Sequence, residues 1–237
     1  MADVCVIGGG AAGLTAAYFA AAGGAAVTVY ERNEACGKKL NITGKGRCNL
    51  TNQCDIQTFL QNVPVNPRFL YKALNNFPPE QVMQFFEMLG VPLKVERGRR
   101  VFPVSDRAAD ITAALVNACR AMGVKLVHAR VRGVNAENGC FSHIALGGGK
   151  KAHHDACIIA TGGASYPRTG SDGDGYAFAK SVGHTVVALK PSLVPLCSDD
   201  ALCADCMGLS LKNVKVSFSS AEGKPLYSEM GEMLFTH

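Results

Sequence analysis

The sequence predicts an α/β fold, with a parallel sheet and flanking helices, followed by the beginning of a second, β-rich region. Three features of the chain lead to this prediction. An apolar strand-like run, a glycine-rich turn and an alanine-rich helix follow one another within residues 3–22. A second apolar run, ACIIATGG at 156–163, ends in small residues, as strands do where a parallel sheet borders a ligand crevice. Beyond Lys190, prolines and strand-like runs replace the helical patterns.

The amino-terminal stretch has the order of a strand–turn–helix–strand unit. Val4–Ile7 is a short β-rich run, and a glycine turn at 8–13 follows it. An alanine-rich helix then extends to about Ala22, where two glycines end it. Ala25–Tyr30 forms a second strand, which closes on Glu31. The glycine interruptions favour this unit over a membrane span, although the stretch is long and uncharged.

Each glycine of the motif G-x-G-x-x-G has a physical role in binding a dinucleotide. Gly8 permits the tight turn, Gly10 lets the backbone approach a pyrophosphate, and Gly13 lets the helix lie close to the sheet. The helix N-terminus offers unpaired N–H groups and the positive end of its dipole to the phosphates. Glu31 follows about 20 residues later, where a carboxylate accepts hydrogen bonds from ribose hydroxyls. Arg32 leaves a 2′-phosphate, and therefore NADP, as an alternative ligand.

A second stretch, NITGKGRCN at 41–49, also has residues suited to phosphate, because two glycines flank a lysine and an arginine follows. It is not a P-loop. That motif needs a glycine six residues before the lysine, and Ser or Thr directly after it. Lys39 and Gly46 occupy those two positions.

Composition and charge narrow the class of protein. The chain has 237 residues, of which 48% are apolar, and a net charge of +5, which suits one large domain, or one domain and part of another. The basic residues are scattered, whereas nucleic-acid binders gather them in a stripe with stacking aromatics. We therefore expect no nucleic-acid partner and no membrane association. An anionic small ligand explains the mild basic excess.

The ten cysteines are irregularly spaced. Cys5 and Cys157 lie inside apolar strand-like runs, where free thiols behave as small hydrophobic residues. Asp3 stands where a secretory signal would have its basic segment, and the first strand begins at once. These features favour a reducing cytoplasm over a secreted disulfide scaffold.

Helical and strand-like segments alternate through the middle of the chain. A helical pattern runs from Pro67 to Leu89 and includes a proline pair, and another runs from Asp106 to Met122, with Asp106 as its expected N-cap. Pro92–Phe102 has the pattern of a hairpin. Short strands are expected at Val124–His128, Arg130–Val134, Phe141–Leu146 and His154–Ala160.

Two groups of residues resemble metal sites without completing one. DGDG at 172–175 opens like a calcium loop, but Gly183 stands where that loop needs a glutamate. Cys197, Cys203 and Cys206 suggest zinc, but a structural zinc site takes four ligands, and no fourth is near in the sequence. We therefore expect no metal.

The character of the chain changes after Lys190. Prolines mark a boundary there, and Val214–Ser219 and Leu226–Phe235 have the pattern of antiparallel strands joined by the turn AEGKP. We expect 1–190 to form the first domain and 191–237 to form the beginning of a β-rich second domain.

Four motifs, taken in order, resemble one family. They are VIGGGAAG with VYER, GKKLNITGKGRCNLTN, GRRVFPVSDRAADI, and IIATGGASYPRTGSDGDGYAFAKSVGH. Together they cover nearly the whole chain, and the second and fourth are long and specific. The chain resembles the NAD(P)/FAD-dependent oxidoreductases of the BaiN-like, or aminoacetone-oxidase, type.

The resemblance implies a Rossmann-like FAD-binding domain of the glutathione-reductase type, with the start of a β-rich insert domain after it. FAD would lie extended on the amino-terminal unit, and the segment after the second strand would follow its flavin half. Arg47 and Lys39 would offset negative charge there, and Asn49 would hydrogen-bond the flavin edge. The other implied contacts are Gly8, Gly10, Ala12 and Gly13 for the pyrophosphate, Glu31 for the ribose, Val131 for adenine, Gly44 and Gly46 for close approach of the backbone to the flavin half, and Thr161 and Gly162 from the later strand.

The activity that the resemblance implies is hydride transfer between NAD(P)H, FAD and a small organic substrate. An activated enone, as in reductive bile-acid steps, and an amine are the expected substrate classes. Tyr166 and His184 are candidate proton donors, and no residue is assigned as the catalytic acid or base.

Two other functions stay open. A dithiol–disulfide flavoprotein would use a cysteine pair, and the sequence offers Cys36 with Cys48, or Cys203 with Cys206. The first pair is spaced more widely than such enzymes use, and the second lies outside a strand–helix–strand context. Members of the family are also longer, so we expect a truncated member. A fragment that binds FAD without catalysis is therefore the other alternative.

Overall fold

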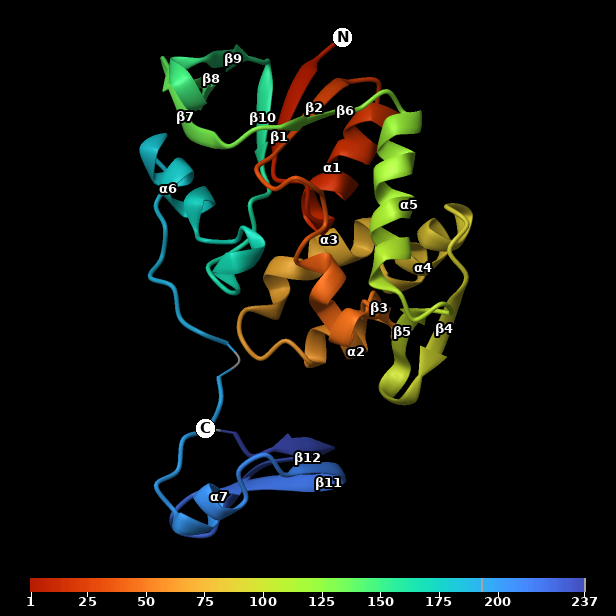
Figure 1. Ribbon diagram of the computed structural model, residues 1–237, viewed down its shortest axis with the longest axis vertical. Coiled ribbons are helices and arrows are strands. Elements are labelled where there is room, and N and C mark those ends of the chain that lie inside the picture. Colours follow the sequence, from red (N-terminus) through yellow and green to blue (C-terminus); the bar gives the residue numbers. More distant parts are fainter. Residues whose placement is uncertain (193, 237) are drawn as a thin grey trace. The chain divides into compact units, whose positions relative to one another are not determined.

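The computed structural model describes residues 1–192 and 194–236 of the chain. Its contacts divide the chain into two compact units, Met1–Val186 and Val187–His237 (Figure 1). The division lies close to the boundary that we expect between residues 190 and 191. Among the described residues, no helix is both long enough and apolar enough to span a membrane.

A four-stranded parallel sheet forms the centre of the first unit (Figure 1). The strand order is β10-β1-β2-β6, which confirms the α/β fold predicted from the sequence. Ile7 pairs with both Tyr30 and Ile159, so that three strands end at the same edge of the sheet. The strands are β1 Asp3–Ile7, β2 Ala26–Glu31, β6 Lys125–His128 and β10 Ala156–Ile159.

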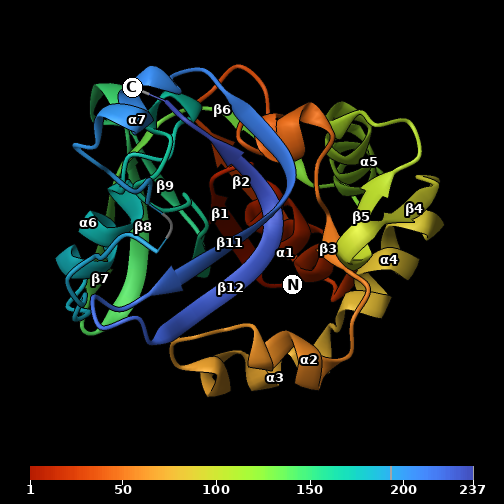
Figure 2. The same cartoon turned by 90° about the horizontal axis from the view of Figure 1, so that it is seen from below.

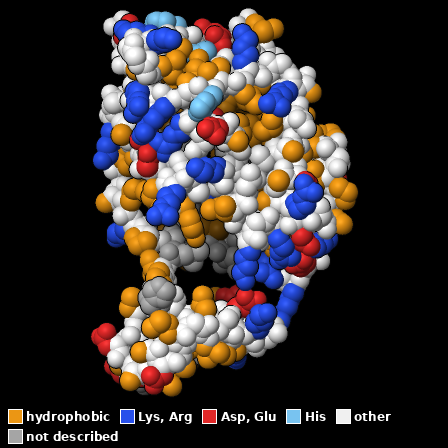
Figure 3. Space-filling model, in the orientation of Figure 1, with side chains coloured by type: hydrophobic (Ala, Val, Ile, Leu, Met, Phe, Trp, Pro, Cys, Tyr) orange, Lys and Arg blue, Asp and Glu red, His pale blue; other side chains and the backbone are white. Residues whose placement is uncertain are grey.

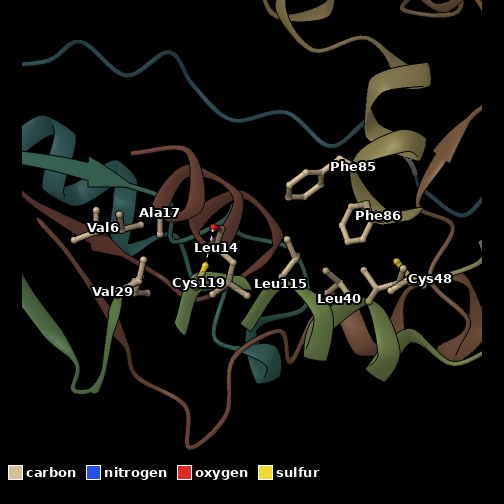
Figure 4. Packing of buried hydrophobic residues seen from close by; sticks show 14 of the residues in the cluster. Val6, Leu14, Ala17, Val29, Leu40, Cys48, Phe85, Phe86, Leu115 and Cys119 are labelled. Atoms are coloured by element: carbon tan, nitrogen blue, oxygen red, sulfur yellow. Dashed lines mark hydrogen bonds between the residues drawn. The ribbon is translucent and has the colours of Figure 1, made fainter. Parts of the chain in front are cut away.

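Two helices cover one face of this sheet. Helices α1, Ala11–Ala22, and α5, Ala108–Ala121, pack against each other and against the strands (Figure 4). Leu14 and Leu115 are almost fully buried there, and Cys119 Sγ donates a hydrogen bond to the Leu14 carbonyl oxygen at 3.3 Å. The many alanines of α1 let the helix lie close to its neighbours, because their side chains are short.

An antiparallel sheet and one helix cover the other face. Alternate side chains of β1 point to opposite faces, so Val4 and Val6 pack with the two helices, whereas Cys5 and Ile7 pack with the antiparallel sheet. Phe178 of the covering helix joins that second cluster. The covering elements are β7 Val131–Glu137, β8 Cys140–Leu146, β9 Lys151–His153 and α6 Asp174–Ser181. The short turn η4 Gly147–Gly149 lies between β8 and β9 in the chain, and η5 Pro167–Thr169 precedes α6.

The segment between β2 and α5 forms a small region of short helices and a three-stranded sheet of order β3-β5-β4. Helices α2, η2 and α3 pack on one another (Figure 2). The helical pattern from Pro67 to Leu89 is divided among η2, α3 and α4, because the proline pair starts a new helix. The elements are η1 Leu40–Gly46, β3 Thr51–Asn52, α2 Ile56–Gln61, η2 Pro67–Leu70, α3 Tyr71–Asn76, α4 Pro79–Met88, β4 Leu93–Glu96, η3 Arg97–Arg99 and β5 Arg100–Pro103.

Asp106 is not the N-cap of α5, so that prediction is wrong. Arg107 holds the position, and its side chain makes no capping bond. The Asp106 carboxylate instead accepts hydrogen bonds from Arg47 at 3.2 Å and Lys94 at 2.6 Å. Asp106 also has a φ of +55°, whereas an N-cap residue is usually extended, as Arg107 is here, so the helix begins one residue later than expected.

The second unit contains a short helix and an antiparallel hairpin. Helix α7 spans Ala201–Asp205, and strands β11, Ser210–Ser219, and β12, Pro225–Leu234, form the hairpin. Both expected strands are present, and the first begins earlier than predicted. Cys203 lies within α7, and Cys206 is its C-cap.

Candidate nucleotide-binding site

A cavity of about 770 Å³ lies in the first unit where β1, β2 and β10 end. Its walls come from the turn after β1, the end of β2 and the segment that follows it, the link between β6 and β7, and the segment after β10. Open parallel sheets bind ligands in this crevice, and the volume suits a cofactor or another small molecule.

The three glycines of the motif after β1 have different surroundings. A Cβ on Gly8 would lie 2.5 Å from the Ala160 carbonyl oxygen, and a Cβ on Gly13 would lie 1.8 Å from that of Gly8. Gly8 also has a φ of +108°, which favours glycine. A Cβ on Gly10 would meet no atom within 4 Å, and Gly10 lines the cavity. The packing of the chain itself therefore requires Gly8 and Gly13, whereas Gly10 leaves open space.

The N-terminus of α1 borders this space. Gly10 is its N-cap, so no side chain caps the helix, and its first turn contains no acidic residue. The first N–H groups of a helix have no partner within it, and they carry the positive end of the helix dipole. Ala12 lines the cavity next to Gly10, whereas Gly13 is buried and does not line it. This end of the cavity suits a diphosphate.

Glu31 lies at the end of β2 and lines the cavity. Its Oε2 accepts a hydrogen bond from the Gly9 N–H at 2.6 Å. Its Oε1 accepts two from Asn33, one from the backbone N–H at 2.8 Å and one from Nδ2 at 2.7 Å. A carboxylate has about four acceptor positions, so Glu31 is held in place and still has capacity for a ribose hydroxyl.

Arg32 also lines the cavity, but its guanidinium group is bound to the protein. Nη1 donates to the carboxylates of Asp172 and Asp174 at 2.7 and 3.1 Å, and Nη2 donates to the Gly170 carbonyl oxygen. Arg130 donates to the same two carboxylates, at 3.4 and 3.0 Å. Arg32 lowers the pKa of Asp172 to about 2. These contacts do not support a role for Arg32 in binding a 2′-phosphate.

Only some residues of the segment after β2 line the cavity. Lys39 and Asn49 line it, and Lys39 Nζ donates a hydrogen bond to the Ser165 carbonyl oxygen at 2.7 Å. Gly44 and Gly46 are not among the lining residues. A Cβ on Gly44 would lie 2.8 Å from the backbone nitrogen of Asn49, so Gly44 allows the segment to approach itself rather than a ligand.

Arg47 is not among the residues that line the cavity, so the role that the resemblance implies for it stays a prediction. Its Nη1 donates to Glu96 at 2.9 Å and to Asp106 at 3.2 Å, and its guanidinium group lies 4.1 Å from the ring centre of Phe102. These three partners satisfy its charge within the small sheet.

Val131, Thr161 and Gly162, the remaining predicted positions, all line the cavity. Arg130 and Tyr176 are among the lining residues that the sequence motifs do not indicate. Tyr176 belongs to the fourth motif, whose polar, glycine-rich residues before it indicate only a turn. The unusual length of that motif is the one feature of the sequence that points to a site residue there.

Neither candidate proton donor lies on the cavity. Tyr166 is 68% exposed, His184 is also exposed, and both are absent from the cavity lining. No catalytic residue is assigned on this evidence.

The cysteines do not form a reactive pair in the cavity. All ten are free thiols. Cys48 lines the cavity, whereas Cys36 does not, and burial raises the pKa of both thiols. A raised pKa disfavours the thiolate that disulfide exchange needs. Over residues 1–192 and 194–236, the structure contains no cluster of three or more His, Cys, Asp or Glu side chains that could hold a metal ion.

Comparison with protein families matches residues 2–237 to the model described as the HI0933-like protein Rossmann domain. The chain belongs to the HI0933-like family. This membership agrees with the parallel sheet and the glycine turn of the first unit, and it confirms the resemblance that the four motifs indicate.

Two curated relatives of this HI0933-like chain have named activities. The 3-dehydro-bile acid delta(4,6)-reductase of Clostridium scindens is 36% identical over 198 residues, which are 83% of this chain and 47% of the relative. The ribosomal RNA dihydrouridine synthase of Escherichia coli is 28% identical over 237 residues, which are 99% of this chain and 57% of the relative. The chain thus spans about half the length of the curated relatives it matches.

A solved structure shows the same fold. It is the 3-ketosteroid-delta4-(5alpha)-dehydrogenase from Rhodococcus jostii RHA1 in complex with 4-androstene-3,17-dione. The TM-score is 0.57 at 19% identity, over 77% of this chain and 54% of the other. A likeness at this identity concerns the fold alone.

Proposed function

We propose that the cavity binds FAD and that the protein is an FAD-dependent oxidoreductase, which reduces an activated carbon–carbon double bond with electrons from NAD(P)H. The observation that carries this proposal is the open space at Gly10, beside the N-terminus of α1 and with Glu31 on the same cavity. A diphosphate fits the helix N–H groups, and a ribose fits the carboxylate. The cavity also reaches the segment after β2, which supports an extended ligand.

Different residues of the cavity wall would contact different parts of the cofactor. Val131 offers an apolar surface to adenine, and Lys39 offers positive charge to phosphate or to negative charge on the flavin. Asn49 and Thr161 offer hydrogen-bonding groups to the flavin end. FAD, when bound, supplies the hydride-transfer chemistry.

We propose an α,β-unsaturated carbonyl compound as the substrate class. The relative with 36% identity is named for the reduction of a 3-dehydro-bile acid. The relative that matches over 99% of the chain is named for the synthesis of dihydrouridine in ribosomal RNA. The ring of uracil also contains a double bond conjugated to a carbonyl group, so the two names point to the same kind of bond.

We favour a small molecule over RNA as the substrate that contains this double bond. On the face that Figure 3 shows, the Lys and Arg side chains of the first unit are spread out rather than gathered in one stripe. Arg32, Arg47 and Lys94 are also paired with carboxylates. RNA-binding surfaces concentrate positive charge and add stacking aromatics. Reduction of uracil in RNA is the second candidate, supported by the relative with 28% identity.

We propose a reducing compartment, the cytoplasm, for this protein. Cys5 and Cys157 are in register on neighbouring strands, and both are free thiols. Free thiols at such close positions persist under reducing conditions, which supports the proposal.

Measurements of FAD binding and of electron transfer with the purified chain test this function. We expect the chain to retain FAD, its visible absorption to be bleached by NADH or NADPH without oxygen, and the colour to return when a steroid enone is added. Return of the colour only with a uridine-containing RNA supports the second candidate. Bound FAD that neither nucleotide bleaches supports a fragment that binds without catalysis. A chain that takes up no FAD at any concentration refutes the cofactor proposal.

A further inference from the structure

Two cysteines lie opposite each other on neighbouring strands of the parallel sheet. Cys5 of β1 is in register with Cys157 of β10, and the two strands lie side by side (Figure 1). Side chains in register on adjacent strands point to the same face, and both cysteines pack in the cluster between the parallel sheet and the antiparallel one. Both are free thiols, and neither lines the nucleotide cavity. The proposed function therefore gives this pair no role.

The spacing of the two strands brings the thiols within reach of a disulfide bond. Adjacent strands lie about 4.8 Å apart, and disulfides join cysteines whose Cα atoms are about 4.4–6.8 Å apart. The two Cβ atoms of a disulfide are about 3.8 Å apart on average, so bonding would draw the strands together by about 1 Å at this point. A disulfide that distorts its surroundings is reduced more readily than a relaxed one. The pair thus suits reversible oxidation.

The two thiols differ in exposure and in acidity. Cys5 is fully buried, whereas Cys157 is partly exposed. The hydrogen bond between the thiols lowers the pKa of Cys157, and the same bond, together with burial, raises the pKa of Cys5. Cys157 therefore has the larger share of thiolate, which is the form that reacts with oxidants. It is also the thiol that a small oxidant can reach, and Cys5 lies next to it as the second thiol.

Both strands lead from this pair to the turn that we assign to the diphosphate. Gly8 and Ala160 each follow three residues after one of the cysteines. A Cβ on Gly8 would lie 2.5 Å from the Ala160 carbonyl oxygen, and the Ala160 N–H donates a hydrogen bond to the Ile7 carbonyl oxygen at 2.9 Å. Close-packed interiors transmit such displacements, so a movement of β1 towards β10 shifts the glycine turn.

We propose that Cys5 and Cys157 form a site of reversible oxidation, at which hydrogen peroxide produces a disulfide that weakens nucleotide binding at the turn after β1. The sulfur of Cys157 attacks one oxygen of the peroxide, the O–O bond breaks, and the hydroxide that leaves takes up the thiol proton and becomes water. The sulfur of Cys5 then displaces the hydroxyl group from the sulfur of Cys157, and this group leaves as a second water with the proton of Cys5. Two thiols are oxidised to one disulfide, and one peroxide is reduced to two waters. An added dithiol reverses the reaction by exchange.

Mass spectrometry of the peroxide-treated chain tests whether this disulfide forms. The protein is treated with hydrogen peroxide and denatured, its remaining thiols are alkylated with N-ethylmaleimide, and it is digested. We expect two peptides joined through Cys5 and Cys157, which dithiothreitol separates. Cys140→Ser, which removes an exposed cysteine outside the pair, is the matched control and should give the same joined peptides. The proposal is overturned if Cys5 and Cys157 are both recovered alkylated although the exposed Cys197 has been oxidised.

Titration with FAD measures the consequence for binding. We expect the oxidised wild-type chain to bind FAD at least about fivefold more weakly than the reduced chain, and dithiothreitol to restore the affinity. Cys48 is also a free thiol and lines the cavity, so Cys157→Ser is treated in the same way and should keep its affinity. If circular dichroism shows that Cys157→Ser does not fold, Cys157→Ala replaces it. An equal loss of affinity in wild type and in the folded variant assigns the effect to another thiol and refutes the proposal.

The outcomes separate this proposal from the proposed function, on which only the effect on FAD rests. FAD binding without formation of the disulfide refutes the oxidation site alone. A disulfide that leaves FAD affinity unchanged refutes the coupling between the cysteine pair and the glycine turn. A chain that forms the disulfide but takes up no FAD refutes the proposed function, and it supports the oxidation site itself.

Discussion

Replacement of Gly10 by alanine separates ligand binding from folding in this protein. The backbone of Gly10 has φ −85° and ψ −171°, a conformation that alanine adopts without strain. The added methyl group would meet no protein atom within 4 Å, at a position that lines the cavity. The substitution therefore leaves the packing of the chain intact and occupies the space that we assign to the pyrophosphate.

The expected magnitudes follow from these surroundings. Alanine is a poorer N-cap than glycine by up to about 1 kcal/mol, and the loss of chain freedom in the unfolded state returns about 0.4–1 kcal/mol. We therefore expect the free energy of unfolding of Gly10→Ala to change by less than about 1 kcal/mol. FAD should bind at least about tenfold more weakly, equivalent to about 1.4 kcal/mol, because the phosphates can no longer approach the backbone.

Urea unfolding and titration with FAD measure the two quantities independently. Gly147→Ala is a matched control, because a Cβ there also meets no atom within 4 Å and Gly147 does not line the cavity. Gly13→Ala is the opposite case. Its Cβ would lie 1.8 Å from the Gly8 carbonyl oxygen, so we expect a loss of stability of about 1–3 kcal/mol or more. If Gly10→Ala binds FAD as tightly as wild type, the diphosphate does not lie at this turn.

Three further predictions follow from the buried and charged contacts. Glu31→Ala should weaken FAD binding by more than about tenfold and lower stability by about 1–2 kcal/mol, because it also leaves N–H groups of Gly9 and Asn33 without their acceptor. Unchanged FAD affinity in a titration would show that the ribose is elsewhere. The pKa of Asp172 is about 2 in the folded protein and 3.8 ordinarily, so its ionised form stabilises the fold above about pH 4, and this contribution is lost as the pH falls towards 2. Urea unfolding should therefore show wild type to be more stable than Asp172→Asn at neutral pH, with the difference disappearing by about pH 2; a constant difference would contradict the ion pair with Arg32. Leu115→Ala, in the core between α1 and α5, should lower the free energy of unfolding by about 2–5 kcal/mol, whereas the exposed Leu189→Ala should have little effect. Equal unfolding midpoints for these two variants would show that the packing described here is wrong.

Much of the fold could be predicted because it depends on interactions between near neighbours in the sequence. The glycines at 8, 10 and 13 lie within one turn and one helix start, and their spacing already implies the close approach that the structure shows. The apolar runs of β1, β2 and β10 are continuous because both faces of a parallel sheet are buried. For the same reason, the cavity positions Gly10, Glu31 and Thr161 could be named from the ends of those runs.

The expectations that the structure does not support concern charged side chains whose partners are distant in the sequence. Arg47 and Asp106 were expected to serve a cofactor and a helix cap, and they pair with each other instead. Arg47 lies within the stretch 41–49, whose glycines and basic residues suit a phosphate, so its neighbours in the sequence favoured a ligand. A local pattern carries no information about an ion pair that forms only when the small sheet assembles.

By itself, the sequence determined the strand–turn–helix–strand unit, the parallel class of the sheet and the glycine opening for a diphosphate. These depend on backbone conformation and on the periodicity of apolar residues, which are local properties. Only the tertiary structure decided that Arg32 is bound by Asp172 and Asp174, and that Arg130 and Tyr176 join the cavity. These side chains meet because strands far apart in the sequence end at one edge of the sheet, and the choice of partner for each charge depends on that meeting.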